Sequence, residues 1–183
     1  QTMTTRPIAR TISLFFNLSL ARLIFISSVA ISFFKVSSNS VSFTTIGTAF
    51  ASKYKKTGDV SVIFMGDGTL GEGACHESLN MAATLKLPVI YALINNGYAI
   101  STPCKEAHPQ VELKDWAAGY NTPGYRIDGN DIEAVVEATE AAVERARNGE
   151  GPTVLEFMTY RWQGHFAGDP AACRPQEEMD YWV

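Results

Sequence analysis

The sequence has few cysteines and no excess of positive charge. Its three cysteines are widely spaced and form no C-x-x-C pair, which argues against a disulfide framework or a cysteine zinc site. A net charge of −4 gives no support for a nucleic-acid or anionic-membrane partner, because such a partner needs a basic face. Any phosphate group must therefore be held locally, by a metal ion, backbone amides or a single arginine. Cys75 falls within a predicted helix, and we interpret it as a small buried hydrophobic residue.

The first 43 residues contain no Asp or Glu and are rich in Ser, Phe, Ile and Leu. Their basic residues are Arg6, Arg10, Arg22 and Lys35. The apolar run 23–34 has twelve residues and is too short to cross a bilayer alone. Extending the run upstream to residue 11 makes it long enough but places Arg22 in the middle, where a charge is costly. A membrane anchor over residues 11–34 is therefore disfavoured.

Two other interpretations of this segment remain open. A basic, Ser-rich and acid-free composition is typical of organellar targeting peptides. Alternatively, the segment is not native to the rest of the chain and comes from a misjoined gene, which is the hypothesis that we favour. The sequence thus divides into an atypical extension, residues 1–43, and one domain, residues 44–183. The expected compartment is the cytoplasm or the mitochondrial matrix.

From residue 44 onward, buried strands alternate with helices. The pattern predicts helices over 45–56, 74–87, 112–119 and 132–147, the last of them capped by Asp131. It predicts strands over 60–65, 89–94, 125–128 and 153–160. Nearly continuous apolar strands that alternate with helices favour an α/β fold, with a parallel sheet covered by helices on both faces.

Polar residues follow two of these strands at the points where the strands end. Asp67 follows the first strand inside a glycine-rich turn, and Asn95-Asn96 follow the second strand. If the two strands are neighbours, both loops face one crevice at the carboxyl edge of the sheet. A carboxylate, an amide oxygen and a backbone carbonyl are ligands that suit Mg²⁺, which often shares its shell with substrate phosphates. Either motif alone is ordinary turn chemistry, but their joint occurrence after two buried strands predicts a metal and diphosphate site.

The spacing GDG-x26-NN and the text GDGTLGEGACHESLNMAATLKLPVIYALINNGYAISTP resemble the α subunits of thiamine-diphosphate-dependent 2-oxo acid dehydrogenases. Within that family the sequence is most similar to acetoin and pyruvate dehydrogenase α subunits, from Gly47 to the end. The resemblance implies the thiamine-diphosphate-binding fold, with Mg²⁺ held by the side chains of Asp67 and Asn96 and the carbonyl oxygen of Tyr98. The cofactor contacts that it implies are Gly66, Gly68, Thr69, Leu70, Asn96 and His165.

The segment YRWQGHFAGDP, residues 160–170, is similar to the family loop Y-R-x-x-G-H-x-x-x-D-P. By its residue type alone, His165 is more often a structural group than a catalytic one. The resemblance implies a catalytic role for His165, stabilising charge or moving a proton beside the cofactor. Where eukaryotic pyruvate dehydrogenase α subunits have a regulatory serine, this chain has Phe166, so kinase control there is not expected. We expect no clear partner for His76 or His108.

The resemblance also implies partners and a reaction. A β subunit supplies the other half of the site, including the glutamate that activates the cofactor, in an α2β2 assembly. The substrate is acetoin or a 2-oxo acid, and the acyl group passes to lipoamide on an acyltransferase. The family has sequence before the Gly-Asp-Gly motif that residues 1–43 do not match, and it continues beyond Val183. We therefore expect an incomplete fragment, and the alternative is a non-catalytic product that keeps the motif but assembles no active site.

Overall fold

The structure is a computed structural model, and it describes residues 38–182 apart from 110–111, 167 and 170–173. The hypotheses about residues 1–37, including the disfavoured anchor at 11–34, lie outside the described residues. In the part of the chain that is described, no helix is long and apolar enough to cross a membrane. The predicted boundary between residues 43 and 44 stays a prediction, and a helix that begins at Ser38 runs across it.

Four parallel strands form one sheet. They are β1 (Ser61–Gly66), β2 (Val89–Asn95), β5 (Gly124–Asp128) and β6 (Thr153–Met158). Their order across the sheet is β1-β2-β6-β5, and every neighbouring pair is parallel. The predicted parallel sheet is confirmed, and so is the expectation that the first two strands are neighbours.

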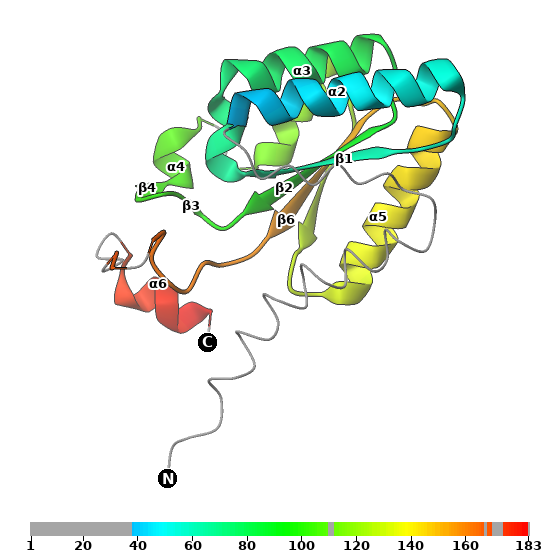
Figure 1. The fold of residues 1–183 in the computed structure, drawn as a ribbon. Coiled ribbons are helices and arrows are strands. Elements are labelled where there is room, and N and C mark those ends of the chain that lie inside the picture. The colour runs from blue at the N-terminus through cyan, green and yellow to red at the C-terminus, as the bar shows by residue number, and fades with distance from the viewer. Residues whose placement is uncertain (1–37, 110–111, 167, 170–173, 183) are drawn as a thin grey trace.

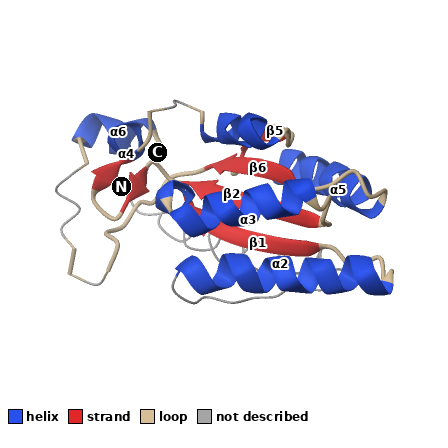
Figure 2. Ribbon diagram, turned by 90° about the horizontal axis from the view of Figure 1, so that it is seen from above, coloured by secondary structure: helices blue, strands red, loops and turns tan. Residues whose placement is uncertain are grey.

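Helices cover both faces of the sheet, as predicted. On one face lie α2 (Ser38–Lys55), α3 (Gly73–Thr84) and the 3-10 helix η2 (Leu113–Tyr120), and on the other lies α5 (Ile132–Arg147) (Figure 1). Seen from above, α2 runs beside the β1 edge of the sheet and α3 lies next to it (Figure 2). Alternate strand residues supply the two cores, so Tyr91 and Leu93 pack under α3 while Ile90 and Phe157 pack against α5.

The helix predicted over 74–87 ends earlier, at Thr84. Lys86 adopts a left-handed conformation with a φ of 46°, and the amide of Leu87 then donates to the carbonyl of Ala82 at 2.9 Å. The ammonium of Lys53 on α2 donates to the exposed carbonyl of Leu85. A left-handed residue with such closing bonds ends a helix, and the chain turns there into β2.

Short elements that the sequence did not predict lie beyond the carboxyl ends of the strands. They are the 3-10 helix η1 (Asp67–Gly71), the hairpin β3 (Tyr98–Ala99) and β4 (Thr102–Pro103), α4 (Cys104–Ala107) and α6 (Gln176–Tyr181). Figure 1 shows β3, β4, α4 and α6 gathered at this end. The strand predicted over 153–160 ends at Met158, because its neighbour β2 ends at Asn95. One further hydrogen bond, from the amide of Thr159 to the carbonyl of Asn95, continues the ladder.

Candidate functional site

The strand register brings the predicted loops to one edge. Gly66 at the end of β1 pairs with Ile94, and Asn95 at the end of β2 pairs with Met158 at the end of β6. Asp67, Asn96 and the loop after β6 therefore leave the sheet side by side. This register supports the expectation that these loops face a common crevice.

Asp67 lies at the first position of η1 and is only 1% exposed. Its Oδ2 atom has no hydrogen-bond partner among the described residues. Burial raises the pKa of this carboxyl, while backbone hydrogen bonds and the charges of His108 and Arg161 lower it in part. A buried carboxylate oxygen without a partner is costly, and a bound cation would remove that cost. This atom is the observation by which the site fits a metal ion.

The two asparagines at the end of β2 make different hydrogen bonds. Asn95 is buried, donates its Nδ2 to Glu156 Oε1 at 2.7 Å, and accepts from the amide of Gly97 at 3.0 Å. Asn96 is half-buried, and its Oδ1 accepts from the amide of Tyr98 at 3.2 Å. These turns fold the loop, with Gly97 at a φ of 84°. The second lone pair of Asn96 Oδ1 remains for a ligand, as the predicted metal set requires.

The residues of the glycine-rich turn differ in their exposure to solvent. Gly66 is exposed and ends β1. A side chain at Gly68 would place its Cβ only 2.7 Å from the Cβ of Ala99, so the close approach of η1 to the hairpin requires glycine. Thr69 is half-buried, whereas Leu70 is 3% exposed and packs into the core. Only the backbone of Leu70 is thus available to a cofactor.

The loop after β6 carries the predicted catalytic histidine. His165 is exposed, and its Nδ1 lies 3.2 Å from an Nη1 atom of Arg161. A guanidinium has only donors, so His165 Nδ1 accepts this bond and the ring proton lies on Nε2. The backbone amide of His165 donates to Asp169 Oδ2 at 2.7 Å. The loop therefore presents His165 as a hydrogen-bond donor through Nε2.

A buried arginine holds this loop against the hairpin of β3 and β4. Arg174 is 6% exposed and donates to the carbonyls of Arg161 and Gln163. Its guanidinium lies over the rings of Tyr98 and Tyr160, at 5.3 and 5.6 Å from their centroids. These contacts tie the loop after β6 to the hairpin that follows β2, although nothing in the sequence pattern singles out Arg174.

The expectation that His76 and His108 lack clear partners is wrong. His76 Nδ1 lies 2.6 Å from the hydroxyl of Tyr120, and His108 Nε2 lies 2.9 Å from the backbone oxygen of Asp67. Both partners come from tertiary packing, between residues 41 or more positions apart, so no local pattern could have identified them. Cys75, by contrast, is 2% exposed and is the buried hydrophobic residue that was predicted.

The donor set suits a hard cation. Within the described residues, no three His, Cys, Asp or Glu side chains gather as a metal cluster. The predicted ligands include only one such side chain, Asp67, and add an amide oxygen and a backbone carbonyl. All three are oxygen donors, which Mg²⁺ prefers and which leave positions for phosphate oxygens and water.

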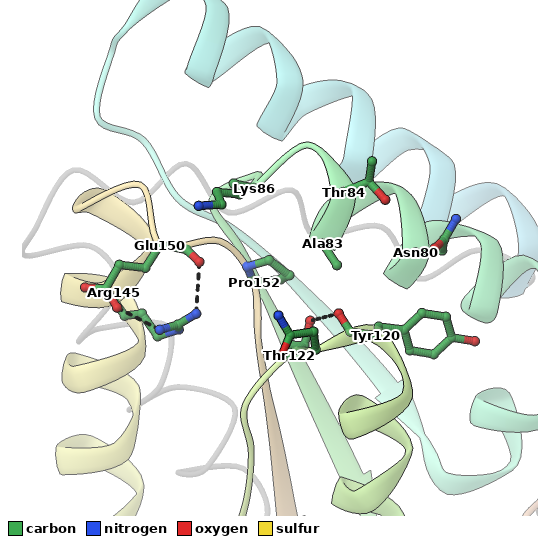
Figure 3. Close-up of a pocket in the computed structure, with 10 residues that line it drawn as sticks. Asn80, Ala83, Thr84, Lys86, Tyr120, Thr122, Arg145, Glu150 and Pro152 are labelled. Atoms are coloured by element: carbon green, nitrogen blue, oxygen red, sulfur yellow. Dashed lines mark hydrogen bonds and ion pairs between the residues drawn. The ribbon is translucent and has the colours of Figure 1, made fainter.

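A hollow of about 380 Å³ lies at the opposite, amino end of the strands (Figure 3). Lys86 precedes β2 there, Pro152 precedes β6, and Arg145 pairs with Glu150 at 2.7 Å across its rim. None of the predicted site residues lines it. The hollow is therefore separate from the candidate metal site.

The model of the dehydrogenase E1 component family matches residues 27–183, which include every residue of the candidate site. The chain belongs to this family. It is 49% identical over 132 residues to the α subunit of acetoin:2,6-dichlorophenolindophenol oxidoreductase from Bacillus subtilis, covering 72% of this chain and 40% of that protein. It is 44% identical over 133 residues to the pyruvate dehydrogenase E1 component α subunit of Rhizobium meliloti, covering 73% and 38%.

A third relative is the 3-methyl-2-oxobutanoate dehydrogenase α subunit of Mycobacterium tuberculosis, 41% identical over 139 residues. That match covers 75% of this chain and 38% of the relative. The chain thus spans about two fifths of the length of the curated relatives that it matches. A solved structure from Mycobacterium smegmatis, described as a thiamin diphosphate-dependent enzyme, aligns with a TM-score of 0.50 and 22% identity, covering 66% of this chain and 22% of that one. This likeness supports the fold assignment.

Proposed function

We propose that this dehydrogenase E1 chain supplies the magnesium- and diphosphate-binding half of a thiamine-diphosphate site in an α subunit. Asp67, Asn96 and the carbonyl of Tyr98 hold Mg²⁺, and Gly66, Gly68, Thr69, the backbone of Leu70 and His165 adjoin the cofactor. The observation that carries the proposal is the buried Asp67 Oδ2 without a partner, at the edge where the loops after β1, β2 and β6 converge.

The names of the relatives support the proposed reaction class. The similar proteins are named for acetoin, pyruvate and 3-methyl-2-oxobutanoate, so the proposed substrate is acetoin or a 2-oxo acid. When bound, thiamine diphosphate supplies the nucleophilic carbon and the electron sink for cleavage of the bond beside the substrate carbonyl. This chain binds and orients that group. His165 stabilises charge or moves a proton at Nε2, the nitrogen that the contact with Arg161 leaves protonated.

The proposed site is completed by other chains. A β subunit contributes the remaining half, in an α2β2 assembly, and a lipoyl-bearing acyltransferase takes the acyl group. The proposed compartment is the cytoplasm or the mitochondrial matrix. Support for the β partner comes from the relatives' names, each of which designates an α subunit.

Asp67→Asn tests the metal assignment. Loss of a peripheral group at a metal site costs about 10–100-fold in affinity, so loss of a direct carboxylate ligand should cost at least that. Calorimetric titration with Mg²⁺ and thiamine diphosphate, with and without the β partner, should show heat for the wild type and none for Asp67→Asn. Asp115→Asn, which changes an exposed carboxylate on η2, is the matched control.

Two outcomes contradict the proposal. Metal-dependent binding that persists in Asp67→Asn would show that the metal is held elsewhere. Absence of heat for the wild-type chain under both conditions would favour the non-catalytic alternative.

A further inference from the structure

His108 joins the turn that carries Asp67 to the body of the domain. It follows α4 and is 6% exposed. Its Nε2 lies 2.9 Å from the backbone oxygen of Asp67, at the start of η1. Its Cε1 would lie 3.4 Å from a Cβ added at Gly71, at the end of η1. One imidazole therefore lies beside the first residue of the turn, to which it is hydrogen-bonded, and beside the last.

The hydrogen bond at Asp67 has a defined direction. A backbone carbonyl only accepts, so His108 Nε2 carries the proton and donates. The bond engages the backbone of Asp67 and leaves the carboxylate Oδ2 without a partner among the described residues. A donor aimed at the carboxylate would compete with a cation, whereas a donor aimed at the backbone fixes the turn without occupying the ligand atom.

Aromatic packing fixes the imidazole in turn. The ring of Trp116 on η2 meets His108 edge to face, with centroids 5.6 Å apart and an interplanar angle of 85°. The ring of Trp116 also lies 4.7 Å from the ring of His76 on α3, and His76 contacts the Tyr120 hydroxyl. The stack ties η1 to α3 and η2, two of the elements that cover this face of the sheet.

We propose that His108 is a positioning residue for the metal site: its Nε2–H holds η1 so that Asp67 presents a free carboxylate oxygen to the cation. This inference rests on the proposed function for the identity of the ligand. The geometric part, a turn held by one imidazole donor, stands on the contacts alone. Neither the glycine-rich motif nor the Asn pair includes His108.

Three substitutions in the full chain distinguish whether His108 acts as a hydrogen-bond donor or only fills space. His108→Leu keeps most of the volume and removes the donor. His108→Gln keeps a donor, because its Nε2 reaches about as far along the side chain as that of histidine. His76→Leu alters the same aromatic stack without touching Asp67 and serves as the matched control.

The first measurement needs no ligand. Loss of one hydrogen bond is worth about 1 kcal/mol, so amide hydrogen exchange at Gly68, Thr69 and Leu70 should be roughly fivefold faster in His108→Leu. His108→Gln and His76→Leu should stay within about threefold of the wild type. If His108→Leu exchanges like the wild type, or if His108→Gln exchanges as fast as His108→Leu, the proposal is overturned.

The second measurement is calorimetric titration with Mg²⁺ at saturating thiamine diphosphate. His108→Leu should bind Mg²⁺ about tenfold more weakly, as expected for a group that orients a ligand, while His108→Gln and His76→Leu bind like the wild type. Wild-type affinity in His108→Leu overturns the positioning role. A wild-type chain that binds no Mg²⁺ contradicts the proposed function instead, and the exchange measurement still decides whether His108 holds the turn.

Discussion

At the residue scale, Glu156 is the most deeply buried charged side chain among the described residues. It lies in the middle of β6 with no exposed surface. Its Oε1 accepts from Asn95 Nδ2 at 2.7 Å, and its Oε2 accepts from the amide of Lys114 at 3.0 Å. Because Asn95 in turn accepts from Gly97, a chain of hydrogen bonds runs from β6 to the loop of the candidate metal site.

Glu156→Gln should therefore destabilise the fold. A glutamine can satisfy either Asn95 or Lys114 with its oxygen, but its amide then faces a second donor. An unsatisfied buried group costs about 1–3 kcal/mol, so the urea unfolding midpoint should fall with an unchanged slope. The control is Glu140→Gln on the exposed side of α5, which should shift stability by less than about 0.5 kcal/mol. Equal stability of the two variants would mean that the buried carboxylate network contributes nothing.

The two described cysteines should be unreactive at neutral pH. Burial, helped by the charge of Glu72, raises the pKa of Cys75 to about 11. Burial, followed by the charges of Asp67 and Glu156, raises the pKa of Cys104 to about 11. Because only the thiolate reacts, alkylation at pH 8 should be about 100-fold slower than for an ordinary thiol, and should rise about tenfold per pH unit up to pH 11. Site-resolved mass spectrometry measures this, and ordinary rates at pH 8 would contradict it.

Some residues of the candidate site were predictable from sequence and others were not. Asp67 and Asn96 could be predicted to lie near each other because each follows a strand that is recognisable from its apolar run in the sequence. Neighbouring parallel strands end at the same edge of a sheet. Glu156 and His108 could not, since their partners are Asn95 and the backbone of Asp67, contacts that only the packed tertiary structure defines. Local patterns identify where loops begin, and tertiary packing decides which side chains support them.

At the element scale, α5 was the most predictable part of the fold. Asp131 caps it, and its side chain accepts from the amides of Glu133 at 3.0 Å and Ala134 at 3.2 Å. Its start and end match the predicted range 132–147 because the cap and the apolar spacing are both local. The hairpin of β3 and β4 and the short α6 were missed, since they depend on distant contacts such as that between Tyr98 and Glu178.

Asp131→Ala should remove the cap of α5. Loss of an N-cap costs about 1 kcal/mol, because two amides of the first turn lose their acceptor. Asp131→Asn keeps the acceptor oxygen and is the matched control, which should lie within a few tenths of a kcal/mol of the wild type. Chemical denaturation followed by circular dichroism measures both. An alanine variant as stable as the asparagine variant would show that the cap is dispensable.

At the scale of the whole molecule, the candidate site joins segments that are far apart in sequence. Asp67 follows β1, Asn96 follows β2, and Arg161 reaches from the loop after β6 to the backbone oxygen of Ile100 in the hairpin. A ligand bound between these loops would contact the carboxyl ends of three strands, β1, β2 and β6, at the same time. Its binding energy should therefore stabilise the sheet as a unit and not one loop.

Thermal unfolding of the whole chain should reveal this coupling. A ligand at about 100 times its Kd adds about 2.7 kcal/mol to the stability of the folded state. For a domain of this size that corresponds to a rise in Tm of roughly 5–10 °C. The rise in Tm should require Mg²⁺ and thiamine diphosphate together, for two reasons. The diphosphate oxygens complete the coordination shell of the metal. The metal in turn offsets the negative charge of the buried Asp67 carboxylate, which would otherwise repel the phosphates. Equal shifts with either ligand alone, or the same shift in Asp67→Asn, would show that the stabilisation arises somewhere other than at this edge of the sheet.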